Sequence, residues 1–172
     1  MLPFRDLLKP STEFLWTQEL QDTFDRSKEE IVKAVKNGVK IYEPSKTTAL
    51  CTDWSKTGIG FMLLQKDCMC EIITPVCCPG GWTLIYAGSR FTSPAESRYA
   101  PVEVECLAAA WALDKTKYFT LGAPSLYLAV DHKPLLKILG DKNLQDIENP
   151  RLQNLKEKTL CYRFKSVHVP GS

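Results

Sequence analysis

The sequence has no long uninterrupted apolar run, no internal repeat and no low-complexity tract. Without such a run it predicts no membrane-spanning helix, and its first residues carry charges where a signal peptide would need apolar side chains. Neither sign of charge dominates, because 22 basic and 20 acidic residues leave a net charge of +2. We therefore expect a soluble intracellular protein with no membrane partner. Its charge supports nucleic-acid binding only weakly and fits an ordinary balanced surface equally well.

The chain is long enough to bury one good core, since 44% of its 172 residues are hydrophobic. Seven cysteines accompany no secretory signal, which favours reduced thiols over a disulfide framework. Four of them lie close together in the sequence and could bind zinc; these are Cys68, Cys70, Cys77 and Cys78. Their C-x-C and C-C spacings are less typical of zinc sites than C-x-x-C, so free loop cysteines are the alternative interpretation.

Apolar periodicity and turn residues predict an α/β fold with a mixed sheet flanked by helices. The first three strands form an antiparallel meander, and a crossover through an alanine-rich helix adds the parallel part. The expected strands are 47–53, 58–65, 82–90, 126–131 and 161–169. The expected helices are 17–36, which Asn37-Gly38 would end, 101–118, 134–139 and 149–158.

Three acidic residues, Asp53, Glu105 and Asp131, stand where the predicted elements can bring them together. Asp53 ends an apolar run and precedes a turn at Gly58, and Asp131 ends a second run just before Pro134. Glu105 lies on the helix between them in sequence. Like charges so close are tolerated only with a divalent cation between them or with a raised pKa on one member. Magnesium suits an all-oxygen site of this kind.

Each of these residues also has an ordinary structural interpretation. Asp53 could be a turn or cap residue, and Asp131 could be the N-cap of the next helix. Glu103 and Glu105 lie 200° apart on a helical wheel and flank its apolar stripe symmetrically, so periodicity does not choose between them. Both could be solvated helix charges. His132 could approach a phosphate or act as a cap, and we assign it no chemistry.

A set of short motifs in one order resembles the ribonuclease H-like domain joined to the reverse transcriptase of gypsy-type long-terminal-repeat retrotransposons. The motifs cover nearly the whole chain. They are Phe14-Leu15-Trp16, Asp53-Trp54-Ser55 with Gly58-Ile59-Gly60, Ser89-Arg90-Phe91, Glu103-Val104-Glu105, Val130-Asp131-His132-Lys133-Pro134-Leu135 and His168-Val169-Pro170-Gly171.

The resemblance implies a ribonuclease H-like fold and an endonuclease that cuts the RNA strand of RNA/DNA hybrids during reverse transcription. It selects Glu105 over Glu103 and implies that Asp53, Glu105 and Asp131 are catalytic ligands of Mg²⁺, with Mn²⁺ as a possible substitute. It also implies a partner, the reverse transcriptase domain of the same polyprotein.

Three further residues are expected to contact the substrate in a protein of this family. Ser55 and Gly58 shape the turn after Asp53, which the resembled fold places near bound nucleic acid. Arg90 is available for a phosphate, although scattered basic side chains are common on any surface.

The resemblance divides the chain into a helical tether from the reverse transcriptase, residues 1–44, and a ribonuclease H-like domain, residues 45–172. Two departures from the family pattern stand out. Trp54 replaces a small residue, which we interpret as a packing change, because neighbouring strand residues point to opposite faces. The family also continues to an Ala-Asp that supplies a fourth carboxylate and to a C-terminal helix, so we expect a domain truncated at its C-terminus with that helix missing.

Two other functional classes remain as alternatives, of which the first follows from these departures. The chain could be a catalytically impaired remnant that only binds nucleic acid or protein. A DNA-cutting or strand-transfer nuclease of the same fold superfamily is a further alternative, which the Asp131-His132-Lys133-Pro134-Leu135 motif and the tether motif argue against.

Overall fold

The computed structural model describes residues 4, 7, 12–36, 40–72, 74–75 and 77–169. The chain falls into two compact units, Met1–Val39 and Lys40–Ser172, which are described separately. Two predicted features, the helix stop at Asn37-Gly38 and the end of the last motif at Pro170-Gly171, lie outside the described residues. The division into a tether and a truncated domain stays a prediction.

The first unit contains one long helix, α2, over Gln18–Lys36, which confirms the helix predicted from apolar spacing. The Thr17 hydroxyl accepts a hydrogen bond from the Leu20 amide at 3.3 Å and so caps the first turn. Aromatic rings gather before and along this helix; they belong to Phe4, Phe14, Trp16 and Phe24. Among the described residues, no helix is both long and apolar enough to cross a membrane.

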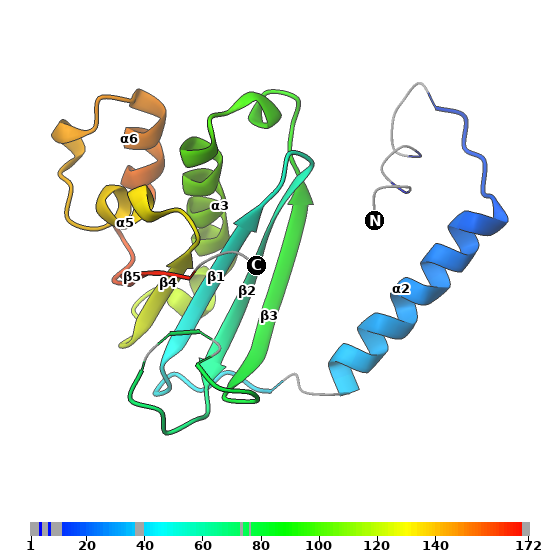
Figure 1. Cartoon of the computed structure of the whole chain (residues 1–172), viewed down its shortest axis with the longest axis horizontal. Coiled ribbons are helices and arrows are strands. Elements are labelled where there is room, and N and C mark those ends of the chain that lie inside the picture. The colour runs from blue at the N-terminus through cyan, green and yellow to red at the C-terminus, as the bar shows by residue number, and fades with distance from the viewer. Residues whose placement is uncertain are drawn as a thin grey trace. The chain divides into compact units, whose positions relative to one another are not determined.

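The second unit is built on a five-stranded sheet with the strand order β3-β2-β1-β4-β5 (Figure 1). The strands are β1 Thr48–Trp54, β2 Gly58–Lys66, β3 Trp82–Phe91, β4 Leu126–Val130 and β5 Lys165–His168. The first three form an antiparallel meander, while β4 runs parallel to β1 and β5 runs parallel to β4. The predicted mixed sheet is therefore confirmed.

Helices cover one face of this sheet and close the core (Figure 1). They are α3 Pro101–Lys115, α4 Lys117–Thr120, α5 Lys133–Leu139 and α6 Pro150–Glu157, with short 3₁₀ turns at Glu96–Arg98 and Leu144–Asp146. The buried side chains Leu50 and Leu63 of the central strands pack in one cluster with Leu113 of α3. The alanines of α3 let this helix lie close to the sheet, because their short side chains keep the two layers near each other.

Two predicted elements are shorter than expected. The helix expected at 101–118 ends at Lys115, where the Thr116 hydroxyl bonds back to the Ala112 carbonyl at 2.8 Å and a separate short helix begins. The last strand covers Lys165–His168 rather than 161–169. Tyr162 and Phe164 precede it and pack against the core from an irregular segment.

Candidate active site

Asp53 and Asp131 lie at the same end of the sheet because they stand at the ends of two parallel strands. Asp53 is the second-last residue of β1, and Asp131 comes directly after β4, which pairs with β1 in parallel. Both side chains are exposed. Parallel strands end at one edge of a sheet, so the strand order itself brings these two carboxylates together. The expectation that Asp53 and Asp131 stand near the ends of two strands agrees with this placement, and their metal-binding role stays a prediction.

The turn after Asp53 is held by one serine side chain. The Ser55 hydroxyl accepts hydrogen bonds from the Gly58 amide at 3.1 Å and the Thr57 amide at 3.3 Å. A Cβ at Gly58 would lie 3.1 Å from the Arg90 carbonyl oxygen, so a side chain there would crowd the neighbouring strand. The prediction that Ser55 and Gly58 shape this turn is confirmed, and their contact with substrate stays a proposal.

Glu105 reaches the same region from α3 and is almost fully buried, with 1% of its surface exposed. Burial raises the pKa of its carboxyl to about 9. Asp131 adds to the rise through a hydrogen bond and through like-charge repulsion, and the charge of Asp53 adds a smaller amount. The nearby Trp54 acts in the opposite direction and lowers this pKa. The three predicted carboxylates are therefore electrostatic neighbours.

One oxygen of Glu105 has no partner. Its Oε2 atom is buried and accepts no hydrogen bond among the described residues. A buried carboxylate oxygen without a donor is costly, and this one also faces two further carboxyl groups. A divalent cation would supply the missing positive charge and would suit a set of donors made only of oxygen. The residues present thus fit the magnesium that the sequence predicts.

The three carboxylates are spread more widely than a closed metal site requires, since their oxygens do not all lie within 4.8 Å of one another. Strand alternation explains the spread. Trp54 shares the face of β1 that α3 covers, whereas Asp53 points to the opposite face, where it lines a shallow hollow of about 260 Å³ with Cys51 and Met62. Glu105 approaches from α3, on the face of the sheet opposite the one to which Asp53 points.

Glu103, the other glutamate of α3, has a structural environment. It accepts hydrogen bonds from the Ala100 amide at 3.0 Å, from the Asn149 side chain at 2.9 Å and from Arg151 at 2.8 Å. These contacts lower its pKa below the ordinary value, with Asn149 as the largest cause. Glu103 thus ties the start of α3 to the start of α6. The alternative in which both glutamates are solvated is wrong, because Glu103 is 7% and Glu105 is 1% exposed.

Two residues that were not predicted as site residues support the carboxylates. Trp54 packs against Ile59 and Val104, and its proximity to Glu105 works against the rise in the pKa of that carboxyl. The His168 Nε2–H donates to the Asp131 carbonyl oxygen at 3.0 Å and fixes the main chain at the end of β4. The histidine of the last motif was visible in the sequence, but its partner depends on the pairing of β4 with β5.

Arg90 is already engaged within the protein. Its guanidinium donates to both oxygens of Glu96, at 2.7 and 2.8 Å, and lies over the Trp111 ring with 5.5 Å to its centre. Hydrogen bonding from Arg90 is the main reason that the pKa of Glu96 is lowered to about 2. A phosphate would have to share this guanidinium with Glu96, so the predicted substrate contact of Arg90 stays a proposal.

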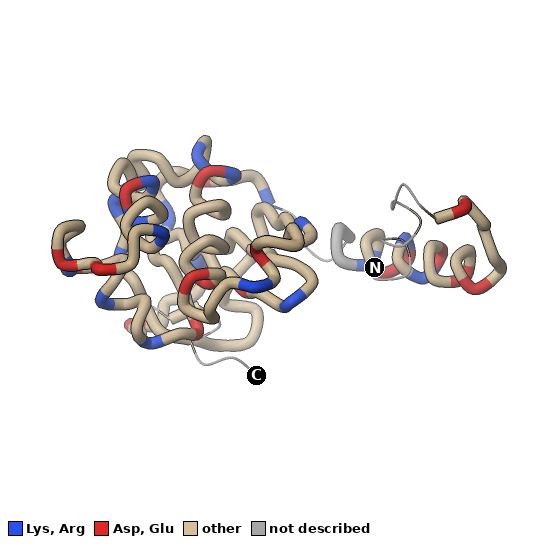
Figure 2. Tube along the Cα trace, turned by 90° about the horizontal axis from the view of Figure 1, so that it is seen from above, with Lys and Arg blue, Asp and Glu red and all other residues tan. Residues whose placement is uncertain are grey.

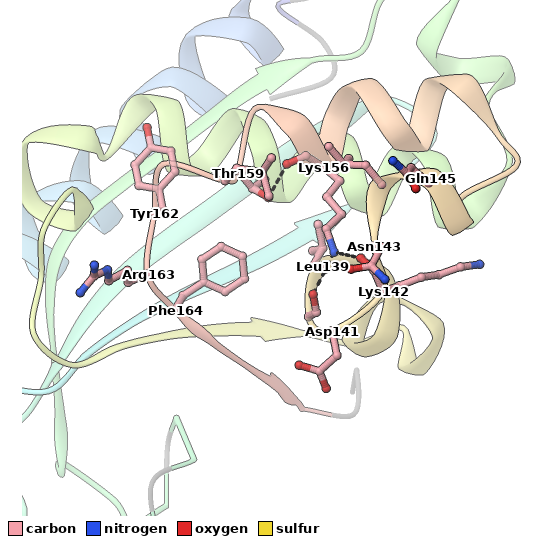
Figure 3. Close-up of a pocket in the computed structure, with 13 residues that line it drawn as sticks. Leu139, Asp141, Lys142, Asn143, Gln145, Lys156, Thr159, Tyr162, Arg163 and Phe164 are labelled. Carbon is pink, nitrogen blue, oxygen red and sulfur yellow. Dashed lines mark hydrogen bonds between the residues drawn. The ribbon is translucent and has the colours of Figure 1, made fainter.

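A larger groove lies elsewhere, between the α5–α6 region and the segment before β5 (Figure 3). The buried Lys156 ammonium spans it and donates to the carbonyls of Gly140, at 2.8 Å, and Lys142, just after α5 ends. A cation at the carboxyl end of a helix satisfies exposed carbonyls and complements the helix dipole. Lys156 therefore has a structural role, and the groove does not include the three carboxylates.

Comparison with known proteins assigns the family. Residues 43–162 match the family described as the RNase H-like domain found in reverse transcriptase. The chain belongs to this family. Over 122 residues, or 71% of its length, it is 31% identical to the retrovirus-related Pol polyproteins from the transposons opus and gypsy of Drosophila melanogaster. The matched part is 11% of the opus polyprotein and 10% of the gypsy polyprotein, so this RNase H-like chain spans about a tenth of these relatives.

The fold also matches one part of a solved structure that contains a reverse transcriptase. The structure of the foamy viral protease-reverse transcriptase in complex with RNA/DNA hybrid matches 99% of this chain with a TM-score of 0.59 and 17% sequence identity, over 23% of the viral chain. At that identity the likeness shows the fold alone. It agrees with the predicted ribonuclease H-like architecture.

Proposed function

We propose that this chain is a retrotransposon-derived ribonuclease H-type endonuclease domain that hydrolyses the RNA strand of RNA/DNA hybrids during reverse transcription. The observation that carries the proposal is the buried, unpartnered Oε2 of Glu105 beside Asp131 and Asp53. Such a cluster suits Mg²⁺, or Mn²⁺ as a substitute. The bound cations would supply an activated water and stabilise the leaving oxygen.

Each carboxylate has a distinct place in this proposal. Asp53, at the exposed end of β1, would bind both cations; Glu105 would share one of them, and Asp131 would hold the other. His168 keeps the Asp131 main chain in place, and Trp54 packs against Val104, the neighbour of Glu105 on α3. Cleavage by a water in line with the leaving oxygen would give a 3′-hydroxyl and a 5′-phosphate.

The substrate class is supported by family membership more than by charge. Basic and acidic residues are interspersed along the trace (Figure 2), in keeping with the net charge of +2. The foamy viral relative was solved in complex with RNA/DNA hybrid. Contacts to the 2′-hydroxyls across the shallow minor groove would distinguish the RNA strand. Because the opus and gypsy relatives are Pol polyproteins, we further propose a reverse transcriptase domain of the same polyprotein as the partner.

Asp53→Asn tests the proposal, because it removes a ligand charge and nearly keeps the side-chain shape. We expect the rate of hybrid cleavage to fall on the order of a hundredfold or more, measured with a labelled RNA/DNA duplex and with DNA/DNA and RNA/RNA duplexes for comparison. The metal-free variant should unfold at a higher temperature than the parent, since one like charge is gone. Magnesium should then raise the unfolding midpoint of the variant less than that of the parent.

Asp114→Asn is the matched control, because Asp114 is an exposed acid at the other end of α3. It should keep both the cleavage rate and the magnesium-dependent midpoint. An unchanged magnesium effect in Asp53→Asn would remove Asp53 from the site. A parent chain that binds hybrid and magnesium but cuts nothing would favour the impaired, binding-only alternative.

A further inference from the structure

Four cysteine side chains meet at the end of the sheet opposite the carboxylates. They come from the loop that joins β2 to β3, and their sulfur atoms all lie within 4.8 Å of one another; the residues are Cys68, Cys70, Cys77 and Cys78. The loop follows Lys66, beside the start of β1, whereas Asp53 lies near the end of that strand (Figure 1). None of the four is in a disulfide.

We propose that these four cysteines form a structural zinc site. Zinc binds thiolates at about 2.3 Å with tetrahedral geometry, which places the sulfurs roughly 3.8 Å apart. The Sγ atoms of Cys68 and Cys77 are 3.4 Å apart, and all four sulfur atoms lie within 4.8 Å of one another. Small movements of the side chains would therefore complete the coordination. With four protein ligands, such a site leaves no open position for catalysis.

The backbone of the loop is folded so that the thiols converge. The amides of Asp67 and Cys68 both donate to the Gly81 carbonyl, at 2.9 and 3.2 Å, and close the loop at its base. A tight turn then runs from Cys78 to Gly81, whose amide donates to the Cys78 carbonyl at 3.1 Å. Gly80, the third residue of this turn, has a φ of 70°, which suits glycine. Local geometry, and not only chain proximity, brings the two ends of the cluster together.

Gly81 leaves room for the sulfurs themselves. A Cβ at this position would lie 2.4 Å from the Cys78 Sγ and 3.0 Å from the Cys68 Sγ. No side chain fits there without displacing two of the thiols. Glycine at this position thus lets the main chain pass close to the sulfurs. The C-x-C and C-C spacings alone gave only weak support for a metal site.

Two neighbouring side chains would stabilise a negatively charged thiolate cluster. The Trp82 Nε1–H donates to the Cys77 Sγ at 3.3 Å, a contact that stabilises a metal-bound sulfur. The Lys66 ammonium donates to the Cys70 carbonyl and so lies near the site. Four thiolates on one Zn²⁺ carry a net charge of −2 after four protons leave to solvent, and a lysine at this distance offsets part of it.

The first experiment measures zinc in the full chain, purified under reducing conditions without chelator, by native mass spectrometry and elemental analysis. We expect one zinc per chain. In competition with a coloured chelator, Cys70→Ser should weaken zinc binding at least tenfold, while Cys161→Ser, an exposed cysteine outside the cluster, should leave it unchanged. Circular dichroism of each variant shows whether the fold is intact, and Gly81→Ala should also weaken binding although it keeps every sulfur.

Cobalt gives a second readout that does not depend on the folding of variants. Titrating Co²⁺ into the zinc-stripped parent should produce the strong visible bands of a tetrahedral thiolate site and saturate at one equivalent. The proposal is wrong if the reduced chain holds no zinc and gives no cobalt bands. It is also wrong if the mass of the purified chain shows disulfides, by a loss of two hydrogens for each, and the chain binds no metal after these are reduced. Asp53→Asn should keep its zinc, which separates this site from the magnesium proposal.

Discussion

Glu103 and Glu105 lie two positions apart on α3 and have opposite environments. Glu103 has three donors, which keep it ionised. Glu105 has a buried oxygen without a donor and two acidic neighbours, which keep it protonated in the metal-free protein. An ionised Glu105 would need a cation, so the difference between the two residues separates a structural acid from a candidate metal ligand.

The pH dependence of stability tests the environment of Glu105. Its pKa is about 9 in the folded protein, above the ordinary value of 4.5, so the folded state holds this proton more tightly than the unfolded chain does. The resulting stabilisation is complete below about pH 4.5 and is lost as the pH rises toward 9. In the presence of chelator, Glu105→Gln should remove this loss and unfold with roughly 1–3 kcal/mol more stability than the parent at pH 8.

Chemical denaturation of parent and variant across this pH range gives the measurement. Asp114→Asn serves again as a control and should keep the slope of the parent. If the free energies of unfolding of the parent and of Glu105→Gln change with pH in the same way, Glu105 does not hold a proton with a raised pKa. With magnesium at pH 8 the parent should instead be more stable than Glu105→Gln, because only the parent can lose a proton and bind the cation with the resulting carboxylate.

Sequence alone could name Glu105 only through resemblance. Glu103 accepts hydrogen bonds from Asn149 and Arg151. These two partners lie more than forty residues further along the chain, and no local pattern reveals them. The two aspartates were easier to predict, because each ends a strand and the strand order follows from the crossover. The contact of Trp54 with Glu105 required the three-dimensional structure, since Trp54 looked like a packing substitution.

At the scale of elements, the sheet was largely predictable and the connections were not. Glycines and alternating apolar residues placed β1 to β4 within one or two residues of their observed bounds. The segment before β5 also alternates, but Tyr162 and Phe164 pack against the core without forming a strand. Periodicity reports which residues are buried, and it cannot tell a short strand from an irregular segment that buries the same side chains.

The Arg90–Glu96 pair links the end of β3 to the turn before α3, and it allows a test of the predicted phosphate contact. Arg90→Met should destabilise the protein by about 1–2 kcal/mol, because it leaves the Glu96 carboxylate partly buried without its partner. If Arg90 also binds a phosphate, the variant should bind hybrid more weakly. The slope of the logarithm of its binding constant against the logarithm of the salt concentration should also be smaller in magnitude by about one. Urea denaturation and fluorescence anisotropy at several salt concentrations measure the two effects.

Glu96→Gln is the matched variant, because it breaks the same ion pair and keeps the arginine. It should lose similar stability and bind hybrid at least as well as the parent, since the guanidinium is released. Equal affinity in Arg90→Met and in the parent would make Arg90 a structural residue only, and the substrate contact would have to be assigned elsewhere.

At the scale of the whole molecule, the buried core belongs almost entirely to the second unit. Apart from Leu20, the buried apolar residues of the described chain lie between Ala49 and Leu155. All three candidate carboxylates and the four clustered cysteines also lie in Lys40–Ser172. The second unit therefore contains both its own core and both candidate metal sites, which is what an independently folding domain requires.

We accordingly expect residues 40–172 alone to unfold in a single cooperative transition, with a midpoint within a few degrees of that of the full chain. The magnesium-dependent shift and the zinc content should be the same in both, because no ligand is removed. If residues 1–44 act as a tether to a polymerase, the two forms should also cut hybrid at equal rates. A shortened chain that unfolds gradually, or that loses its magnesium shift, would instead mean that the first unit contributes directly to the fold of the second.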